Sequence, residues 1–337
     1  MNPIKQLFSR PRRLRPDKVN RGVSDHHRHP TPGTAEYEEH VRAEIEHYGS
    51  IFAEGKGKET LMQPVPASWV EAESRAEHLI RRVTGDDECG HVVRHLNPKS
   101  DSRMLSLGSG PAGVEISLAQ RVPFAEIVCT DINAELLTLG RQRAQDLELN
   151  VKFEVADLNY IELSPRDFDV VFCHASLHHV IELERLAEQI KRTLRPHGVL
   201  ITVDVITRNG YLMWPETRQV VKNIWKTLPE KFRFNHTSSN TPRLDEEILE
   251  ADTSENGMEC ARSEDIMRAL NNNFLTEHYV PLFSLARRFF DTMYGPNYDL
   301  AAALDRSIFD WIWELDLYYL ATGKLQPETF FGVYSAT

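Results

Sequence analysis

The sequence predicts an α/β fold in which a mostly parallel sheet of seven strands carries helices on both faces. Short apolar stretches of strand composition alternate with stretches of helical period over residues 103–205, and this alternation is typical of a parallel sheet. Two further apolar stretches near the end of the chain add the last strands. A glycine-rich turn follows the first strand and polar residues follow the next four, so one edge of the sheet carries a candidate site.

Residues 1–34 differ from the rest of the chain. Residues 1–30 contain eight Lys or Arg, two Asp and four prolines, without apolar periodicity. Because such a segment cannot bury enough apolar surface to become ordered, we expect a disordered basic tail. Its charge could attract an anionic surface, although a solvated tail is the simpler interpretation. No apolar stretch follows the basic residues, so no signal peptide is expected.

Residues 35–99 are predicted to form a helical cap on the domain that follows. A first helix is expected over about 36–52. A second should begin at Ser68, because Ser68 and Glu71 have the spacing of a capping box, and should end at Gly85.

Residues 100–337 are predicted to form the main domain. We expect its strands at 104–107, 126–130, 151–155, 168–173, 199–205, 275–282 and 330–335. Helices should begin near Pro111 and Asn133, and the clearest helical period covers 183–194. Helical insertions follow strands 5 and 6: a lid at about 207–262 and a helical segment at about 285–325.

The second insertion contains a long apolar helix over 301–320. One stripe, expected to be core, consists of Leu304, Ile308, Trp311, Ile312, Leu315 and Tyr319. A second apolar face, with Trp313, Leu317 and Leu320, leaves room for a homodimer contact.

Composition argues against several classes of function. The net charge of −11 disfavours binding to nucleic acid. The four cysteines lie far apart and form no C-x-x-C pair, so neither a zinc site nor a disulfide framework is predicted. No apolar run approaches the length of a membrane span, and a cytoplasmic location is expected.

The glycine-rich turn contains Gly108, Gly110 and Gly113, which allow a ligand to approach the backbone closely. The amides at the start of the following helix would favour a carboxylate or a phosphate. The spacing also fits the G-x-G-x-x-G pattern of dinucleotide sites, so a nicotinamide-dependent oxidoreductase stays open at this point. A tight turn without a ligand is the simplest alternative.

Several further stretches resemble the class I S-adenosylmethionine-dependent methyltransferases. They are Leu105–Gly113, Thr130–Asp131, Ala156–Leu158, Phe168–Phe172, Ser176–Val180 and Leu194–Leu200. The resemblance implies a Rossmann-like class I methyltransferase sheet and S-adenosyl-L-methionine as the cofactor. Many members of this family have an acidic residue where Ser106 stands, and that residue helps to hold the methionine ammonium group.

The resemblance also places the cofactor at the strand ends. Amides of the glycine-rich turn would hold the methionine carboxylate, Asp131 would accept the ribose hydroxyls, and Asp157 would accept the adenine amino group. The residues expected to bind the cofactor are Gly108, Ser109, Gly110, Gly113, Asp131, Ile132, Asp157, Leu158 and His174.

The expected chemistry is O-methylation of a hydroxyl on a small molecule, a sugar or a glycan intermediate. A hydroxyl must lose its proton to react well, and imidazole is a suitable base. Sugar O-methyltransferases that resemble this chain use a histidine and an aspartate, here His178 and Asp204. His179 is the third candidate, with capping or packing as its alternative role.

Other interpretations stay open. His178, Asp204 and a lid carboxylate could collect a metal ion, but no ligand spacing supports one, so none is expected. N-methylation and C-methylation are not excluded. The chain could also be a catalytically silent partner protein that binds S-adenosylmethionine.

Overall fold

The computed structural model describes residues 29–54, 65–96, 101–237, 241–255 and 257–336. Most of the predicted basic tail, residues 1–28, lies outside this range. None of the described helices combines the length and the apolar character needed to cross a membrane.

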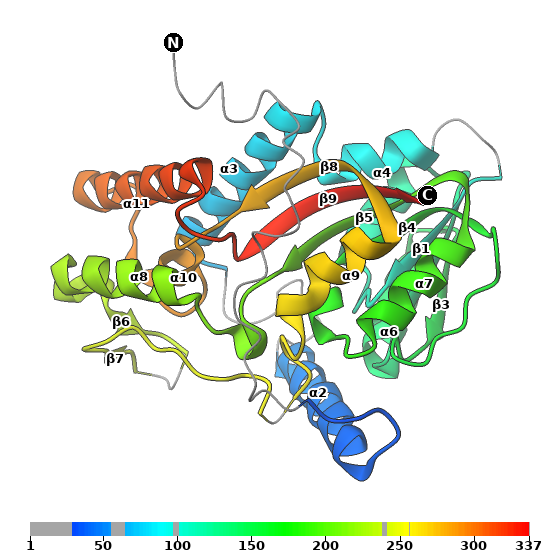
Figure 1. Ribbon diagram of the computed structural model, residues 1–337, viewed down its shortest axis with the longest axis horizontal. Helices are drawn as coiled ribbons and strands as arrows, with labels where there is room; N and C mark the ends of the chain where they lie inside the picture. Colours follow the sequence, from blue (N-terminus) through cyan, green and yellow to red (C-terminus); the bar gives the residue numbers. More distant parts are fainter. Residues whose placement is uncertain (1–28, 55–64, 97–100, 238–240, 256, 337) are drawn as a thin grey trace.

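Seven strands form one sheet in the order β3-β2-β1-β4-β5-β9-β8 (Figure 1). The strands are β1 Arg103–Leu107, β2 Glu126–Asp131, β3 Val151–Val155, β4 Phe168–His174, β5 Leu194–Val205, β8 Phe274–Leu282 and β9 Thr329–Ala336. β1 to β5 pair in parallel, and β9 lies antiparallel between β5 and β8. The carboxyl ends of β1 to β5 and of β8 therefore meet at one edge. The predicted α/β fold is confirmed.

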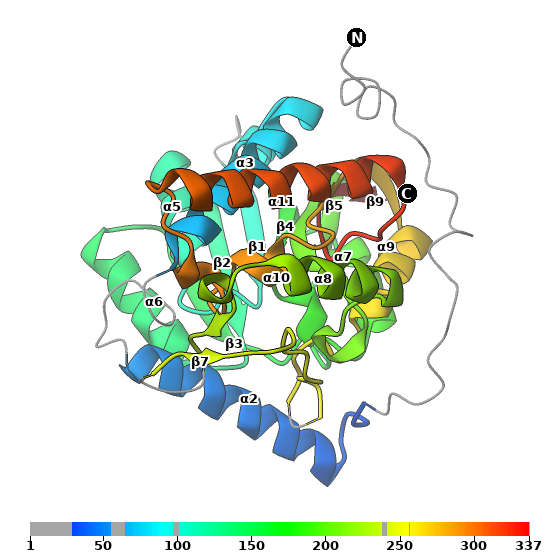
Figure 2. The same cartoon turned by 90° about the vertical axis from the view of Figure 1, so that its left-hand side faces the viewer.

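Helices cover both faces of this sheet (Figures 1 and 2). They are α2 Ala35–Glu54, α3 Ala67–Thr84, α4 Glu88–Leu96, α5 Gly113–Arg121, α6 Ala134–Asp146, α7 Leu183–Thr193, α8 Pro215–Thr227, α9 Ile266–Asn273, α10 Arg287–Phe290 and α11 Ala303–Thr322. Neighbouring residues of a strand point to opposite faces. Met104 accordingly belongs to the core shared with α3, α4, α5, α8 and α11, whereas Leu105 belongs to the core shared with α7 and α9.

The segment predicted as a cap divides into two parts. α3 and α4 contribute buried residues to the same core as the sheet, whereas α2 runs across the strand-end edge (Figure 2). The predicted capping box is wrong, because α3 begins at Ala67, after Pro66 as its N-cap. The Ser68 hydroxyl instead donates to the carbonyls of Phe290 and Gly295, at 3.2 and 3.0 Å. Gly85 ends the helix in the left-handed conformation, as predicted.

The predicted faces of α11 are partly wrong. Leu304 and Trp311 were expected in the core but are 59% and 47% exposed, whereas Trp313, assigned to a dimer contact, is 6% exposed. Two buried carboxylates explain the difference. Asp305 pairs with Lys231, and one oxygen of Asp316 accepts three backbone N–H groups of residues 284–286, at 2.7, 2.7 and 2.9 Å. The spacing of apolar residues cannot show which face of a helix is buried when polar residues fix that face through their own contacts.

Substitutions on opposite faces of α11 should therefore differ strongly in their effect on stability. Phe309 is fully buried and contacts the Phe290 ring, with 4.2 Å between the ring centroids. We expect Phe309→Ala to lower the free energy of unfolding by about 3–5 kcal/mol. Trp311→Ala, on the exposed face, should change it by about 0.5 kcal/mol or less. Urea unfolding followed by circular dichroism measures both, and a larger loss for Trp311→Ala would contradict this assignment of faces.

Candidate active site

A cavity of about 1610 Å³ lies along the carboxyl edge of the sheet. Its walls come from the glycine-rich turn, the loops after β2 to β5, α2, α3, residues 253–259 and residues 282–292. All of the predicted site residues line this one cavity: Gly108, Ser109, Gly110, Gly113, Asp131, Ile132, Asp157, Leu158, His174, His178, His179 and Asp204.

The glycine-rich turn is held between the ends of β2 and β4. Gly108 has a φ of 70°, and a Cβ there would lie 2.6 Å from the Cβ of Ser176, so only glycine fits. The Asp131 carboxylate accepts the Gly110 N–H and the Asn133 N–H, each at 2.8 Å. The Gly110 amide, expected to face the methionine carboxylate, is therefore already used within the protein. Asp131 joins the turn to the start of α6, where Asn133 is the N-cap.

A buried glutamate lies beneath the same turn. The Ser106 hydroxyl donates to Glu115 Oε1 at 2.6 Å, and both side chains are buried. Burial raises the pKa of Glu115. An acidic group therefore lies beside Ser106, and it comes from the first turn of α5.

Asp157 is linked to α2. The Tyr37 hydroxyl donates to Asp157 Oδ2 at 2.6 Å, and the Asn159 side-chain amide donates to the Tyr37 hydroxyl at 2.8 Å. Burial, followed by the Asp157 charge, raises the pKa of Tyr37, so the phenol keeps its proton. α2 is therefore attached to the strand-end residue that was predicted to contact the adenine.

His178 and Asp204 form a tightly hydrogen-bonded pair. Asp204 Oδ1 lies 2.6 Å from His178 Nδ1 and also accepts the Val205 N–H at 2.7 Å. Asp204 Oδ2 accepts the amides of Ser176 and Leu177, at 3.0 and 2.7 Å. Because the carboxylate accepts at Nδ1, that nitrogen carries a proton, and Nε2 is the nitrogen available for chemistry.

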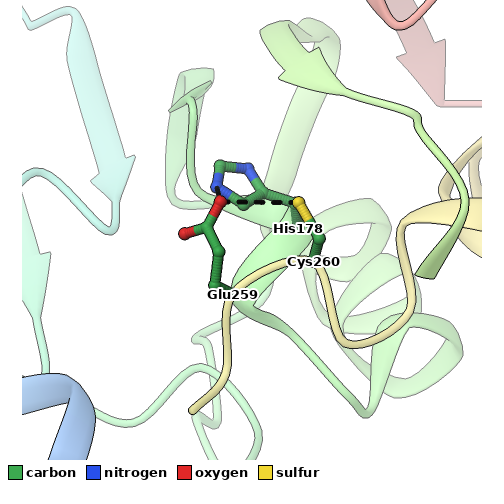
Figure 3. A group of neighbouring side chains, drawn as sticks. All are labelled: His178, Glu259 and Cys260. Carbon is green, nitrogen blue, oxygen red and sulfur yellow. Dashed lines mark hydrogen bonds and ion pairs between the residues drawn. The ribbon is translucent and has the colours of Figure 1, made fainter. Parts of the chain in front are cut away.

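Glu259 faces both histidines of this cluster, and Figure 3 shows its carboxylate beside the His178 ring. Its two carboxylate oxygens lie 3.6 Å from His178 Nε2 and 3.5 Å from His179 Nε2. Burial alone would lower the pKa of His178, but the Asp204 and Glu259 charges outweigh it and raise that pKa to about 10. His178 is consequently an imidazolium at neutral pH while Glu259 is in place.

His179 belongs to the same cluster. Its Nδ1 lies 2.6 Å from Glu44 Oε1 on α2, and its ring centroid is 4.1 Å from that of His178. It does not cap the following helix, because the N-cap of α7 is Glu182. Tyr48, also on α2, donates to Glu259 at 3.2 Å. α2 thus contacts the histidine cluster as well as Asp157.

His178, Glu259 and Cys260 are close enough to suggest a metal site, with ligand atoms within 4.8 Å of one another (Figure 3). The Cys260 thiol instead donates to Glu259 at 3.5 Å. Burial raises the pKa of Cys260 well above its usual value, which keeps sulfur as the thiol, whereas metal binding requires the thiolate. The cluster is a hydrogen-bonded group in this state of the protein.

His174 faces the cavity from the end of β4. Its Nδ1 lies 2.8 Å from Glu88 Oε1 on α4. The Glu88 charge raises the pKa of His174 to about 9. His174 is therefore a second cationic histidine on this wall.

Sequence reasoning missed most of the residues that close the cavity. They are Tyr37, Glu44, Tyr48, Glu259 and Arg287. The segment expected to be a lid contributes little between residues 207 and 236, where Tyr211 lines the cavity and Met213 belongs to the core. The later part of that segment contributes more, with Thr253, Gly257 and Glu259 in the cavity wall.

A twisted sheet of this order, with a glycine-rich turn and carboxylates at its strand ends, defines the class of S-adenosylmethionine-dependent methyltransferases. A family model described as a methyltransferase domain matches residues 98–273, more than half of the chain. The chain belongs to this family, and its cofactor is S-adenosylmethionine.

Curated relatives are similar over the central part of the chain. A demethylmenaquinone methyltransferase of Deinococcus radiodurans is 29% identical over 105 residues, which cover 31% of this chain and 44% of the relative. A phosphoethanolamine N-methyltransferase of Arabidopsis thaliana is 25% identical over 112 residues, covering 33% of this chain and 23% of the relative. The chain thus spans less than half the length of these relatives.

Among solved structures, a geranyl diphosphate C-methyltransferase from Streptomyces coelicolor is 13% identical. The alignment covers 91% of this chain and all of that one, with a TM-score of 0.49.

Asp131→Asn should weaken cofactor binding. The substitution removes the charge and places an amide beside the Gly110 N–H that now donates to the carboxylate. We expect S-adenosylmethionine affinity to fall at least about tenfold, corresponding to about 1.5–3 kcal/mol. Asp146→Asn, at the exposed end of α6, is the matched control and should bind normally. Titration calorimetry measures both, and unchanged affinity in Asp131→Asn would show that this carboxylate is not a cofactor contact.

Proposed function

We propose that this chain transfers the methyl group of S-adenosylmethionine to a hydroxyl of a small molecule, such as a sugar or a glycan intermediate, with His178 as the general base. The observation that carries the proposal is the His178–Asp204 pair, which lies in the same cavity as the glycine-rich turn. When bound, the cofactor supplies a methyl group on a positively charged sulfur. The remaining work, done by the protein, is to hold the reactants and to remove a proton.

The residues of the first half of the sheet fit the cofactor. Asp131 and Asp157 stand at the ends of neighbouring strands and line the cavity. Glycines of the turn leave room for the methionine part, since Gly110 and Gly113 have no atom within 4 Å of a Cβ built there. These contacts are part of the proposal.

The proton moves to His178 Nε2. Asp204 keeps the proton on Nδ1 and would stabilise the imidazolium that forms. In the state described, however, the charge of Glu259 favours a proton on Nε2. An acceptor hydroxyl that reaches Nε2 must therefore displace the Glu259 carboxylate, so Glu259 sets the pH at which the base becomes active.

C-methylation is the second candidate, because similar proteins carry that name. A ubiquinone/menaquinone biosynthesis C-methyltransferase of Dinoroseobacter shibae is 27% identical over 111 residues, covering 32% of this chain and 44% of the relative. A base beside the acceptor would also serve C-methylation of a hydroxylated ring. An acceptor screen that follows S-adenosylhomocysteine release, with product NMR to locate the new methyl group, separates the two. No release with any acceptor would favour a silent binding protein.

His178→Ala should abolish most of the turnover without loss of cofactor binding. Losing a positioned base typically costs about 10²–10⁴ in rate. Asp204→Asn should reduce turnover in the same direction, and the double variant should lose less than the product of the two effects, because the pair acts as a unit. His197→Asn, exposed near the start of β5 and outside the cavity, is the matched control. If His178→Ala keeps full turnover while His179→Ala is inactive, His179 is the base.

The pH dependence of turnover should depend on Glu259. Because kcat/KM reports the free enzyme, we expect its acid limb well above the ordinary histidine range, toward the pKa of about 10 for His178. Glu259→Gln removes one of the two negative neighbours and should move this limb to lower pH. Glu255→Gln, exposed in the same loop, should leave it unchanged. A limb that stays in place in Glu259→Gln would contradict this role.

A further inference from the structure

Arg287 places a guanidinium in the cavity, at the start of α10 and five residues after the end of β8. Its central carbon lies 5.4 Å from the ring centroid of Trp69 and 5.4 Å from that of Tyr211. Two aromatic rings therefore hold the side chain, while its position in the wall leaves it facing the cavity.

Within the described part of the chain, Arg287 has no ion pair and no hydrogen bond, and its Nε is buried without an acceptor. The side chain as a whole is half-buried. The next residue is a fully paired arginine: Arg288 donates from Nε and Nη2 to the two oxygens of Glu328, at 2.8 and 3.0 Å. Because a buried N–H without an acceptor is costly, an external anion at Arg287 would supply the partner that the described residues do not.

Two carboxyl groups on the same wall of the cavity do not pair with the Arg287 guanidinium. Glu73 and Asp291 line the cavity, but within the described part of the chain neither comes within ion-pair distance of Arg287. Asp291 Oδ1 accepts the Met293 N–H at 2.9 Å. Burial raises the pKa of both carboxyl groups against the opposing charge of Arg287. Both carboxyl groups thus interact with the charge of Arg287 at a distance, but neither pairs with the guanidinium directly.

The backbone around Arg287 is held in a fixed position. Asp316 of α11 accepts the three amides of residues 284–286, directly before Arg287. Phe283 and Tyr211 adopt left-handed φ values of 47° and 61°, which non-glycine residues rarely do. Such strain persists only where the surrounding structure maintains it, as is common at binding sites.

The sheet order gives the separation between the strand ends that precede Arg287 and His178. β4, β5, β9 and β8 are neighbours, so the end of β8 lies three strand spacings, about 14 Å at about 4.8 Å each, from the end of β4. Trp69, Tyr211 and Phe283 supply an aromatic wall of the cavity on the β8 side. A molecule that spans this distance meets apolar surface before it meets the charge.

We propose that Arg287 binds an oxyanion, a carboxylate or a phosphate, at the end of the methyl acceptor remote from the reacting atom. The acceptor class is then an acid with an apolar or aromatic body, whose reacting group lies on the order of 14 Å from the anion by the strand spacing above. The planar guanidinium can bind either oxyanion through two parallel hydrogen bonds. This inference rests on the proposed methyl transfer for the identity of the ligand as acceptor, but anion binding itself can be tested without turnover.

The first experiment titrates benzoate and inorganic phosphate separately into the full chain loaded with S-adenosylhomocysteine. Calorimetry compares wild type, Arg287→Gln, Arg287→Lys and Arg306→Gln. Arg306 is the matched control, because it also lies over an aromatic ring but is outside the cavity and paired with Glu71. We expect wild type and Arg306→Gln to bind one probe, Arg287→Gln to bind it at least about tenfold more weakly, and Arg287→Lys to be intermediate. The preferred probe distinguishes a carboxylate from a phosphate.

Failure to bind either probe, or equal binding by Arg287→Gln, would overturn the anion site. Affinity for S-adenosylhomocysteine and melting temperature should be unchanged in Arg287→Gln. Should that variant melt early, Arg287→Lys keeps the positive charge in place, and its loss of affinity relative to wild type decides the question.

The second experiment compares pairs of acceptors that differ only in the acid, such as a hydroxylated aromatic acid and its amide. We expect the acid to have the lower KM, and Arg287→Gln to raise that KM while kcat changes little. If the acid and its amide have the same KM, the proposal that Arg287 binds the anion of the acceptor is wrong, while the proposed methyl transfer is unaffected. If no acceptor releases S-adenosylhomocysteine, the proposed function fails, and probe binding still decides the anion site.

Discussion

The structure of the site depends on one buried carboxylate. Asp204 receives the His178 ring and three backbone amides, and so joins the loop after β4 to the end of β5. A charge buried to this extent is stable only when such donors surround it. The same four hydrogen bonds select the tautomer of His178 and aim Nε2 into the cavity. The hydrogen bonds that fix the fold of the loop after β4 are therefore the same ones that leave Nε2 of His178 available for chemistry.

α2 is held to this site mainly through polar groups. Tyr37 contacts Asp157, Glu44 contacts His179, and Tyr48 contacts Glu259. These partners come from both halves of the cavity. Each contact is a hydrogen bond or ion pair, and Tyr37 is the only buried residue among residues 35–49 of α2. Ligands that enter the cavity therefore compete with the helix for the same groups.

The parts that could be predicted from the sequence are those encoded locally. The strands and the glycine-rich turn are encoded by apolar period, composition and backbone requirements within a few residues, and Asp131, Asp157 and Asp204 lie within two residues of strand ends. Glu259 and Arg287 could not be found in this way, because Glu259 lies in a loop and Arg287 begins the short helix α10, and the positions of both depend on distant packing. The faces of α11 were misassigned for a related reason, since Asp305 and Asp316 find their partners far away in sequence.

The carboxylates that line the cavity should also interact differently with S-adenosylmethionine and with its product, S-adenosylhomocysteine. S-adenosylmethionine carries a positive sulfonium, which transfer of the methyl group removes, while Glu44, Asp131 and Glu259 lie on the cavity wall. Glu44 and Glu259 face His179 and His178, whereas Asp131 forms no ion pair within the described part of the chain. In a site screened little by solvent, the Asp131 charge attracts the sulfonium of the donor and gives the neutral product no comparable attraction. S-adenosylhomocysteine is nearly as large as S-adenosylmethionine, but its inhibition of the enzyme should be weak, because it lacks the positive charge. The charge of the cavity therefore favours replacement of the product by a new cofactor molecule.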